Sequence, residues 1–500
     1  MQAPSRFPGS TIETTAALQD RLMDNHVKWH IFFNKKRFHN HTAHQLLAIY
    51  QLGANGPLID AAYKEEASYQ RKQYDSPGSI TEENFHEHLG DEDYYRAYLK
   101  FFTDVIMEKG PAGTLEKYIF SPKFNIEPPR PDAAPMCMTN RFLSGLLHPL
   151  IQTGYGAEFG LAGMFAEGLA ETAVHRKMAG SLTPSSLWEY AEAAASDAAK
   201  ATVSRIASFL PSLMLDPFRH TPQPPAQKQT NVHALSLVSR ILNDDYYSYK
   251  TIGLPPPEKS EDDTSLERVL HLRGEALTKM MEEWTVDGTN AQEVESKIEE
   301  LFWMNAVIFG VAGYWGRKEM KNGRFNGDFF YLHLVTSALF LPSLVAYLSP
   351  TSTTILLRTY LLNTLALYVA RGRPPLPIAD FYSDVTPNPA APAHVSKKPA
   401  EGTLAPEKLA ANPWLALLQS TIMHPDNHVG KLQRALSHFS ALYGTTPRGH
   451  FRDMGVELKG AECLDGSLFV RTAGLALDRV GWMREGEERR GWDFDGFYHN

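Results

Sequence analysis

Apolar residues recur at helical spacing along most of the chain. Strand-like alternation of apolar and polar residues is rare, and we expect a strand only in residues 467–477. The pattern therefore predicts a mainly α protein: one large helical domain followed by a small C-terminal segment of short elements. The predicted helices cover residues 41–52, 93–108, 139–152, 157–178, 185–210, 264–284, 291–309, 328–348, 353–370 and 412–443.

Three proline-rich stretches interrupt this helical pattern. Residues 220–231 and 253–265 are predicted loops. Residues 376–412 are rich in proline and alanine, which indicates a surface insertion or mobile linker. Helical text resumes at residue 413, so we interpret 1–375 and 413–500 as two parts of one domain.

Composition and charge narrow the class of protein. The chain has 500 residues, 43% of them hydrophobic, which suffices for a large core. The net charge of −8, with no basic block, argues against a nucleic-acid partner. The two cysteines, Cys137 and Cys463, are too few to staple a chain of this size, which favours a reducing, cytoplasmic location.

No segment is predicted to be exported or to cross a membrane. Residues 1–19 contain no apolar run of the kind found in signal peptides. Residues 329–348 are long enough for a bilayer helix, but they contain His333 and Pro342 and lack flanking basic residues. We interpret them as a buried core helix.

Four segments whose strongly apolar or amphipathic pattern predicts helices carry histidines. Burying an imidazole costs free energy unless its nitrogens find partners, and a single buried histidine most often bonds a backbone carbonyl or a carboxylate. Four such segments in one chain shift the interpretation towards a metal ion, which binds several imidazoles at once. The candidates on these segments are His41 and His44, His148, His333, and His424 and His428.

The segment HPDNHVGKLQRAL, residues 424–436, also carries a lysine. On one continuous helix, His424, His428 and Lys431 would share a face. Burial beside a cation would favour the neutral amine of Lys431, which can add carbon dioxide and become a carbamate ligand. Spacing alone favours the simpler alternative, a lysine that reaches solvent or pairs with an acid.

Several nucleotide-binding and hydrolytic motifs do not occur in the sequence. It contains no GxGxxG after a strand, no GxSxG, no P-loop and no HExxH. We therefore expect no flavin or nicotinamide site of the Rossmann type.

Several blocks of text taken together resemble the questin oxidase-like family of fungal secondary-metabolism enzymes. The resemblance implies oxidative opening of an anthraquinone ring, either as a Baeyer–Villiger oxygen insertion or as a dioxygenase-type carbon–carbon cleavage. It also implies a non-haem iron held by four histidines and a carboxylated lysine, which corresponds here to Lys431. We place the four histidines at His44, His148, His333 and His428, with His41, His175 and His424 as alternatives. The blocks are NHTAHQLLAIYQLGA, GLLHPLIQTGYGAEFGLAGMFAEGLAETAVH, DFFYLHLVTSALFLPSL, LLRTYLLNTLALYVARGRP, HPDNHVGKLQRAL, LDGSLFVRTAG and WDFDGFY.

The leading hypothesis is a metal-dependent oxygenase that acts on an aromatic polyketide. Fe(II) is the expected metal, with zinc or manganese as alternatives, and dioxygen is the expected co-substrate. NADPH could be required without a visible binding fold, and the expected partner is a planar aromatic small molecule. The oligomeric state stays open. The competing hypotheses are a zinc-dependent hydrolase and a non-enzymatic helical scaffold.

Overall fold

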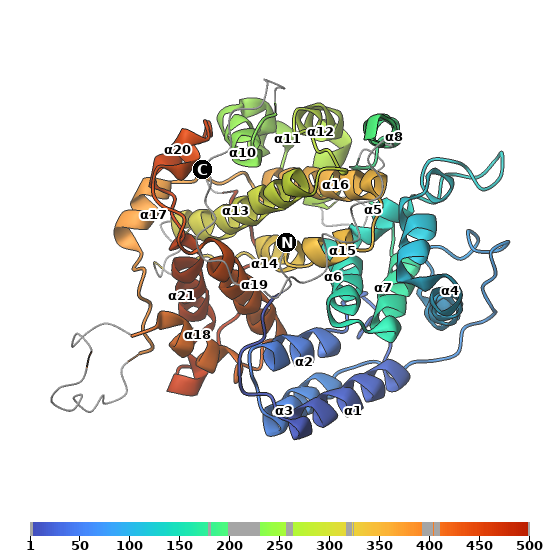
Figure 1. Ribbon diagram of the computed structural model, residues 1–500, viewed down its shortest axis with the longest axis horizontal. Coiled ribbons are helices and arrows are strands. Elements are labelled where there is room, and N and C mark those ends of the chain that lie inside the picture. Colours follow the sequence, from blue (N-terminus) through green and yellow to red (C-terminus); the bar gives the residue numbers. More distant parts are fainter. Residues whose placement is uncertain are drawn as a thin grey trace.

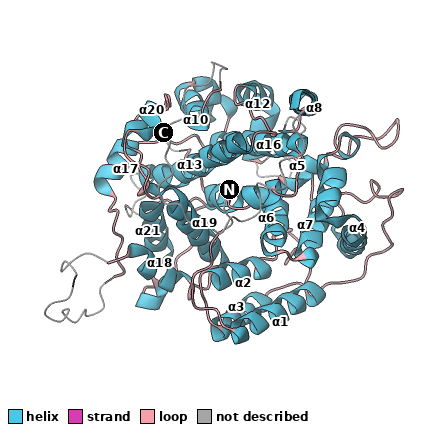
Figure 2. Cartoon of the chain, viewed as in Figure 1, coloured by secondary structure: helices cyan, strands magenta, loops and turns pink. Residues whose placement is uncertain are grey.

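The chain folds into a mainly helical structure, as predicted. The computed structural model describes residues 4–178, 182–198, 231–256, 264–316, 325–392 and 411–498, together with Gly323 and Leu404. Within these residues the strand-type contacts are isolated bridges, and the regular elements are helices (Figure 2).

Two groups of helices lie on opposite sides of the centre of the protein (Figure 1). The helices α1 to α3 pack against one another along the bottom of the view, while α13 and α16 cross its upper part. The helices α6, α14 and α19 lie between these groups, with α7 and α4 packed beyond α6. The bounds are α1 Ile12–Lys28, α2 Thr42–Gln51, α3 Gly56–Ala67, α4 Tyr95–Leu115, α6 Ser144–Phe159, α7 Ala162–Val174, α13 Ala291–Gly316, α14 Phe329–Ala338, α16 Pro350–Ala370 and α19 Asn427–Tyr443.

The remaining α-helices cover this centre on its outer sides. Two of them, α18 and α21, pack against α19, whereas α8 and α12 pack against α16. Their bounds are α5 Met138–Phe142, α8 Ser186–Ala198, α10 Ala234–Asn243, α11 Tyr249–Ile252, α12 Ser265–Glu282, α15 Leu341–Val345, α17 Ile378–Asp384, α18 Pro413–Thr421, α20 His450–Asp453 and α21 Leu468–Val480.

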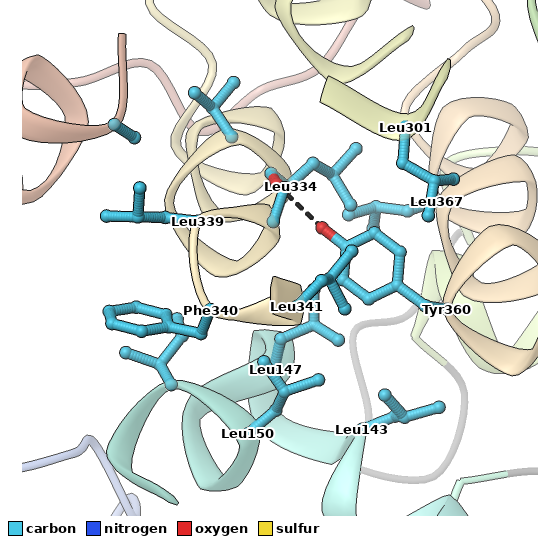
Figure 3. Packing of buried hydrophobic residues seen from close by; sticks show 14 of the residues in the cluster. Leu143, Leu147, Leu150, Leu301, Leu334, Leu339, Phe340, Leu341, Tyr360 and Leu367 are labelled. Carbon is cyan, nitrogen blue, oxygen red and sulfur yellow. Dashed lines mark hydrogen bonds between the residues drawn. The ribbon is translucent and has the colours of Figure 1, made fainter. Parts of the chain in front are cut away.

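Leucines from four helices pack together in the interior of the protein (Figure 3). Leu147 of α6, Leu334 of α14, Leu301 of α13 and Leu367 of α16 are all buried. Each buried leucine contributes on the order of 2 kcal/mol through removal of its side chain from water. The hydroxyl of Tyr360 donates a hydrogen bond of 2.8 Å to the carbonyl of Leu334, which satisfies a polar group inside this apolar packing.

Two predicted long helices are each divided in the structure. Residues 328–348 form α14 and α15, with a break at residues 339–340 just before Pro342. Residues 412–443 form α18 and α19, and His424 lies between them rather than on α19. Proline lacks an N–H, so Pro425 cannot join the backbone hydrogen bonds of a continuous helix, and Asp426 then caps the start of α19.

The predicted strand at 467–477 is wrong. Residues 468–480 form α21, whose buried face includes Leu468, Phe469 and Leu477 and packs against α13 and α19. The apolar positions Leu475 and Leu477 allowed an alternating interpretation, but the same segment also places apolar residues three and four apart. Tertiary packing against two helices decided between the two periods.

Other predicted boundaries moved. The helix expected to end at residue 152 continues to Phe159, where Gly160 takes the left-handed backbone conformation at φ 66° and ends α6. The first part of the expected linker, residues 378–384, forms α17 and buries Ile378 and Phe381. Residues 199–210, 220–230, 257–263, 393–403 and 405–410, which belong to predicted helix, loop or linker segments, lie outside the described residues.

One described helix is long and apolar enough by length and composition to cross a membrane. It is α16, Pro350–Ala370, and its apolar window is entirely buried inside the protein. The segment that the sequence singled out, 329–348, forms two helices of 10 and 5 residues instead.

Candidate metal centre

Four histidines from four separate parts of the chain meet in the buried centre. His41 stands at the N-terminal end of α2, His148 on α6, His333 on α14 and His428 on α19 (Figure 1). All four are at most 8% exposed. The four rings form a closed circuit, which we call the histidine ring. Neighbouring centroids are 4.9 Å apart for His41–His148, 4.8 Å for His148–His333, 5.2 Å for His333–His428 and 4.8 Å for His428–His41.

Local backbone features set the direction of these side chains. Asp328 caps α14 by accepting hydrogen bonds from the N–H groups of Phe330 and Tyr331, and Arg371 binds its carboxylate at 2.7 Å. Before His148, Gly145 has φ 55°, and a Cβ at this position would lie 2.9 Å from the Nε2 atom of His39. Leu146 and Leu147 take the same left-handed conformation, so the close approach of His175 and His39, rather than φ alone, favours glycine at residue 145.

Three of the four histidines hold their Nδ1 atoms in the same way. The Nδ1 atom of His148 lies 2.5 Å from the carbonyl oxygen of Gly145, and that of His333 lies 2.7 Å from the carbonyl oxygen of Phe329. The Nδ1 atom of His428 lies 3.2 Å from a carboxylate oxygen of Asp426. These oxygens can only accept, so each Nδ1 carries the proton and each Nε2 keeps its lone pair. Histidines that bind metals through Nε2 are oriented by this type of contact.

The Nε2 atoms of these histidines can bind a ligand at the centre of the four imidazoles. Those of His333 and His428 are buried and have no hydrogen-bond partner among the described residues. The Nε2 atom of His148 lies 2.7 Å from that of His41. Two nitrogens bound at right angles to one ion, each at about 2.1 Å, would lie about 3 Å apart, which is close to this separation.

Lys431 is buried beside the histidine ring. It lies one turn after His428 on α19, is 2% exposed, and its Nζ atom has no hydrogen-bond partner among the described residues. Burial lowers the pKa of Lys431 to about 7, while the acids Asp426 and Glu66 act in the opposite direction. The interpretation of Lys431 as a lysine that reaches solvent is therefore wrong, and a large neutral fraction of the amine is present near neutral pH.

Burial also keeps the imidazoles neutral. It lowers the pKa of His41, His148 and His333 well below the usual value, and Lys431 adds to the effect. Burial, followed by the charge of Lys431, lowers the pKa of His428 to about 4. Neutral imidazoles are the form that binds metal ions.

His44, a predicted ligand, lies beside the histidine ring. Its ring centroid is 5.6 Å from that of His41 and 6.5 Å from that of His148, and it stacks on Tyr155 at 5.0 Å. Both ring nitrogens of His44 are buried and have no hydrogen-bond partner among the described residues. His41, one of the predicted alternatives, is the residue whose ring lies between those of His148 and His428.

The other two alternatives lie outside the circuit. The Nε2 atom of His175 lies 3.2 Å from that of His39, and the ring of His39 stacks on His148 at 3.8 Å. His424 precedes α19, and its Nδ1 atom accepts a hydrogen bond of 3.1 Å from the N–H of Asp426. The shared helix face predicted for His424, His428 and Lys431 is therefore wrong for His424 and correct for the other two.

The donor set has the chemistry of a metal site, with several neutral imidazole nitrogens and one amine. Among the described residues, no group of three or more histidine, cysteine or acidic side chains is already arranged to hold an ion. Nevertheless, the orphaned Nε2 atoms of His333 and His428 and the orphaned Nζ atom of Lys431 all lie in this one buried region.

The sequence interpretation missed the role of Asp426. Its side chain accepts a hydrogen bond from the N–H of His428 and thereby caps α19, and the same oxygen contacts the imidazole of His428. An aspartate directly after a proline and before amphipathic helical text is a helix-start signal. The signal was present in the sequence, but the expectation of a continuous helix over 412–443 concealed it.

The fold and the site define a helical protein with a buried centre of four histidines and one lysine. The model of the family described as questin oxidase-like matches residues 38–436. The chain belongs to the questin oxidase-like family.

Three relatives illustrate the range of similarity. A questin oxidase of Aspergillus terreus is 25% identical over 456 residues, which cover 89% of this chain and 84% of the relative. The Baeyer-Villiger monooxygenase dmxR6 of a Cryptosporiopsis species is 26% identical over 324 residues, 64% of this chain and 61% of the relative. The oxidoreductase AflY of Aspergillus parasiticus is 33% identical over 162 residues, 31% of each chain. These names describe oxidation, and the chain is accordingly placed among the oxidoreductases.

Proposed function

We propose that this protein is a non-haem iron oxygenase that opens a ring of an anthraquinone-type polyketide in fungal secondary metabolism. The observation that carries the metal part of the proposal is the orientation of three histidines. His148, His333 and His428 each direct Nδ1 to an acceptor and keep the Nε2 lone pair for a ligand. The substrate part is drawn from the relatives, whose names are questin oxidase and Baeyer-Villiger monooxygenase.

The proposed ligands are His41, His148, His333, His428 and a carbamate on Lys431. This set replaces His44 with His41, because the ring of His41 lies between those of His148 and His428. Four neutral imidazoles leave the charge of a divalent ion uncompensated in a buried site, and one anionic oxygen ligand reduces that electrostatic cost.

A neutral Lys431 amine is the reactant that carbamate formation needs. The nitrogen lone pair attacks the carbon of carbon dioxide, a nitrogen–carbon bond forms, and one proton leaves the nitrogen. The lowered pKa of Lys431, about 7, provides the neutral amine without a strong base. The product is a carboxylate on a long arm, held on the same face of α19 as His428.

Bound iron would supply the activation of dioxygen, and the residues of the chain have separate tasks. The carboxylate of Asp426 and the carbonyl oxygens of Gly145 and Phe329 fix the imidazole protons on Nδ1. The surrounding helices exclude water, because His148 and His333 are at most 2% exposed. A water-poor site protects reactive intermediates from hydrolysis.

The direct test combines metal analysis with isotope labelling. Protein purified without added metal is analysed for iron, zinc and manganese, and is then supplied with an anthraquinone, ¹⁸O-labelled dioxygen and, in a parallel assay, NADPH. We expect one equivalent of iron and an oxygen-dependent ring-opened product. One labelled oxygen atom and a requirement for NADPH would indicate oxygen insertion, whereas two labelled atoms without a reductant would indicate carbon–carbon cleavage.

Two results would contradict the proposal in different ways. Stoichiometric zinc with oxygen-independent hydrolysis would replace the oxygenase with a hydrolase. Absence of any stoichiometric metal, with no change in thermal stability on addition of a chelator, would make the histidine ring a structural feature of a scaffold.

A further inference from the structure

One wall of the histidine ring is a partly exposed aromatic residue. Phe329, the first residue of α14, is half-buried. Its ring centroid lies 4.8 Å from that of His333 at an interplanar angle of 62°, and 4.8 Å from that of His428 at 61°. Phe329 therefore contacts two of the four imidazoles in T-shaped arrangements and remains partly exposed.

A second aromatic ring stands outside Phe329. The ring of Phe494 stacks on that of Phe329, with centroids 4.6 Å apart and an interplanar angle of 27°. The side chain of Phe494 is 55% exposed. The exposed side chain of Phe494 thus contacts Phe329, and Phe329 contacts the imidazoles of His333 and His428.

The backbone around Phe494 is firmly held despite this exposure. Arg371 donates a hydrogen bond of 2.8 Å to the carbonyl oxygen of Phe494, and the N–H of Phe329 donates one of 2.8 Å to the carbonyl oxygen of Asp493. The carboxylate of Asp493 is bound by Arg479 at 2.7 Å. Single exposed apolar residues are common on proteins, but this one is fixed in a stacking position against a residue of the site.

We propose that Phe329 and Phe494 form the entrance of the site and bind the substrate by stacking. This inference rests on the proposed function and specifies its substrate as a flat, fused aromatic compound. The two phenyl rings already stack with centroids 4.6 Å apart, and a fused ring system offers a planar surface of larger area. A compound that stacks on this pair approaches the site on the side of His333 and His428.

Other aromatic residues around the site are less suited to this task. Tyr155 is 1% exposed and stacks on His44, so it lies inside the packed interior. The ring of Phe330 lies under the guanidinium of Arg371, with 4.0 Å between the guanidinium carbon and the ring centroid. Phe494 combines exposure with direct stacking on a residue that contacts the histidine ring.

The test measures ligand binding separately from turnover. The metal-loaded protein is titrated without oxygen with 1,8-dihydroxyanthraquinone, and the dissociation constant is compared among the parent, Phe494→Ala and Phe494→Trp. We expect Phe494→Ala to raise the dissociation constant about three- to tenfold, which corresponds to the loss of one stacking contact. Phe494→Trp should bind within about twofold of the parent, because it keeps a flat aromatic surface.

A matched control is available on another surface. Tyr246 is 46% exposed and contacts Tyr247 at 5.2 Å, so Tyr246→Ala removes a comparable aromatic group. This control should bind the anthraquinone as the parent does, and both alanine variants should keep the metal content of the parent.

The outcomes separate this inference from the proposed function. Equal dissociation constants for the parent and Phe494→Ala would overturn the proposed role of Phe494 in binding the substrate at the entrance. Binding by the parent without conversion in the presence of oxygen would remove the proposed reaction and leave the entrance supported if Phe494→Ala still binds more weakly. No binding of the anthraquinone by the parent would overturn both the entrance and the substrate class.

Discussion

The Nε2 atoms of His41 and His148 lie 2.7 Å apart in a region from which water is excluded. The Nδ1–H group of His148 donates a hydrogen bond to the carbonyl oxygen of Gly145, so the Nε2 atom of His148 accepts and the Nε2–H group of His41 donates. An ion that binds both nitrogens must displace the shared proton.

The first prediction concerns the choice between His41 and His44. We expect His41→Ala to lose stoichiometric metal, because it removes one of the four rings that form the circuit. His44→Ala should retain metal, since the ring of His44 stacks on Tyr155 outside the circuit. Metal content of the purified variants, measured by mass spectrometry, checks both results. Retention by His41→Ala together with loss by His44→Ala would restore the ligand set that the sequence suggested.

The second prediction concerns the carbamate of Lys431. Lys431→Ala should lose metal and activity, whereas Lys431→Glu should keep part of each because it retains a carboxylate on a shorter arm. In the parent protein, growth in ¹³C-bicarbonate should give a carbamate signal in the NMR spectrum that is missing from Lys431→Ala. A Lys431→Ala variant with the metal content and turnover of the parent would refute the carbamate.

The third prediction separates the two tasks of Asp426. Asp426→Asn should keep the cap of α19, because asparagine is also a favoured N-cap residue. It should weaken metal binding about 10- to 100-fold, since the orienting carboxylate beside His428 is lost. Asp426→Ala should show the same loss of metal affinity and, in addition, about 1 kcal/mol lower stability. Metal titration and urea unfolding of the metal-free variants distinguish these effects, and unchanged affinity in Asp426→Asn would show that the contact with His428 is incidental.

The fourth prediction concerns stability in acid and uses a histidine away from the centre. The Nδ1 atom of His30 accepts hydrogen bonds from Arg71 at 2.7 Å and from the N–H of Phe32 at 3.0 Å. Burial, followed by the charge of Arg71, lowers the pKa of His30 to about 4. Between pH 6.5 and about 4 the unfolded chain binds a proton at this position that the folded chain does not. As the pH decreases through this range, His30 therefore lowers the free energy of unfolding by about 1.4 kcal/mol per pH unit.

The test compares stability at two pH values. Between pH 7.5 and 5, His30→Gln should lose about 2 kcal/mol less stability than the parent, as measured by urea unfolding of the metal-free proteins. His271→Gln, a change at an exposed histidine, is the control and should follow the parent. Identical pH dependence of the parent and His30→Gln would show that His30 contributes nothing to acid sensitivity.

The fifth prediction concerns the contact between α6 and α7. A Cβ at Gly168 would lie 2.5 Å from the backbone nitrogen of Thr153, so the two helices would have to separate. We expect Gly168→Ala to lower stability by about 1–3 kcal/mol, because overpacking outweighs the better helix propensity of alanine. Gly163→Ala on the same helix is the matched control, since its Cβ would lie 3.6 Å from His26, at ordinary contact distance. It should be neutral or slightly stabilising in thermal unfolding.

The sequence alone determined the helical class and most of the residues that meet at the centre. Apolar spacing located the helices that carry His148, His333 and Lys431, and the lack of polar partners in their neighbourhoods marked these residues as unusual. The spacing of His428 and Lys431 fixed their common face, because both lie on α19 and helix geometry is local.

Tertiary structure decided which histidines face one another. His41 and His44 are three residues apart at the start of α2, and only the packing of α2 against α19 and α6 places His41 between His428 and His148. The pairing of Phe329 with Phe494 joins positions 165 residues apart through the bridge between Asp328 and Asp493. Spacing along a chain specifies a helix face, but contacts between distant segments depend on how the apolar surfaces of all the helices pack together.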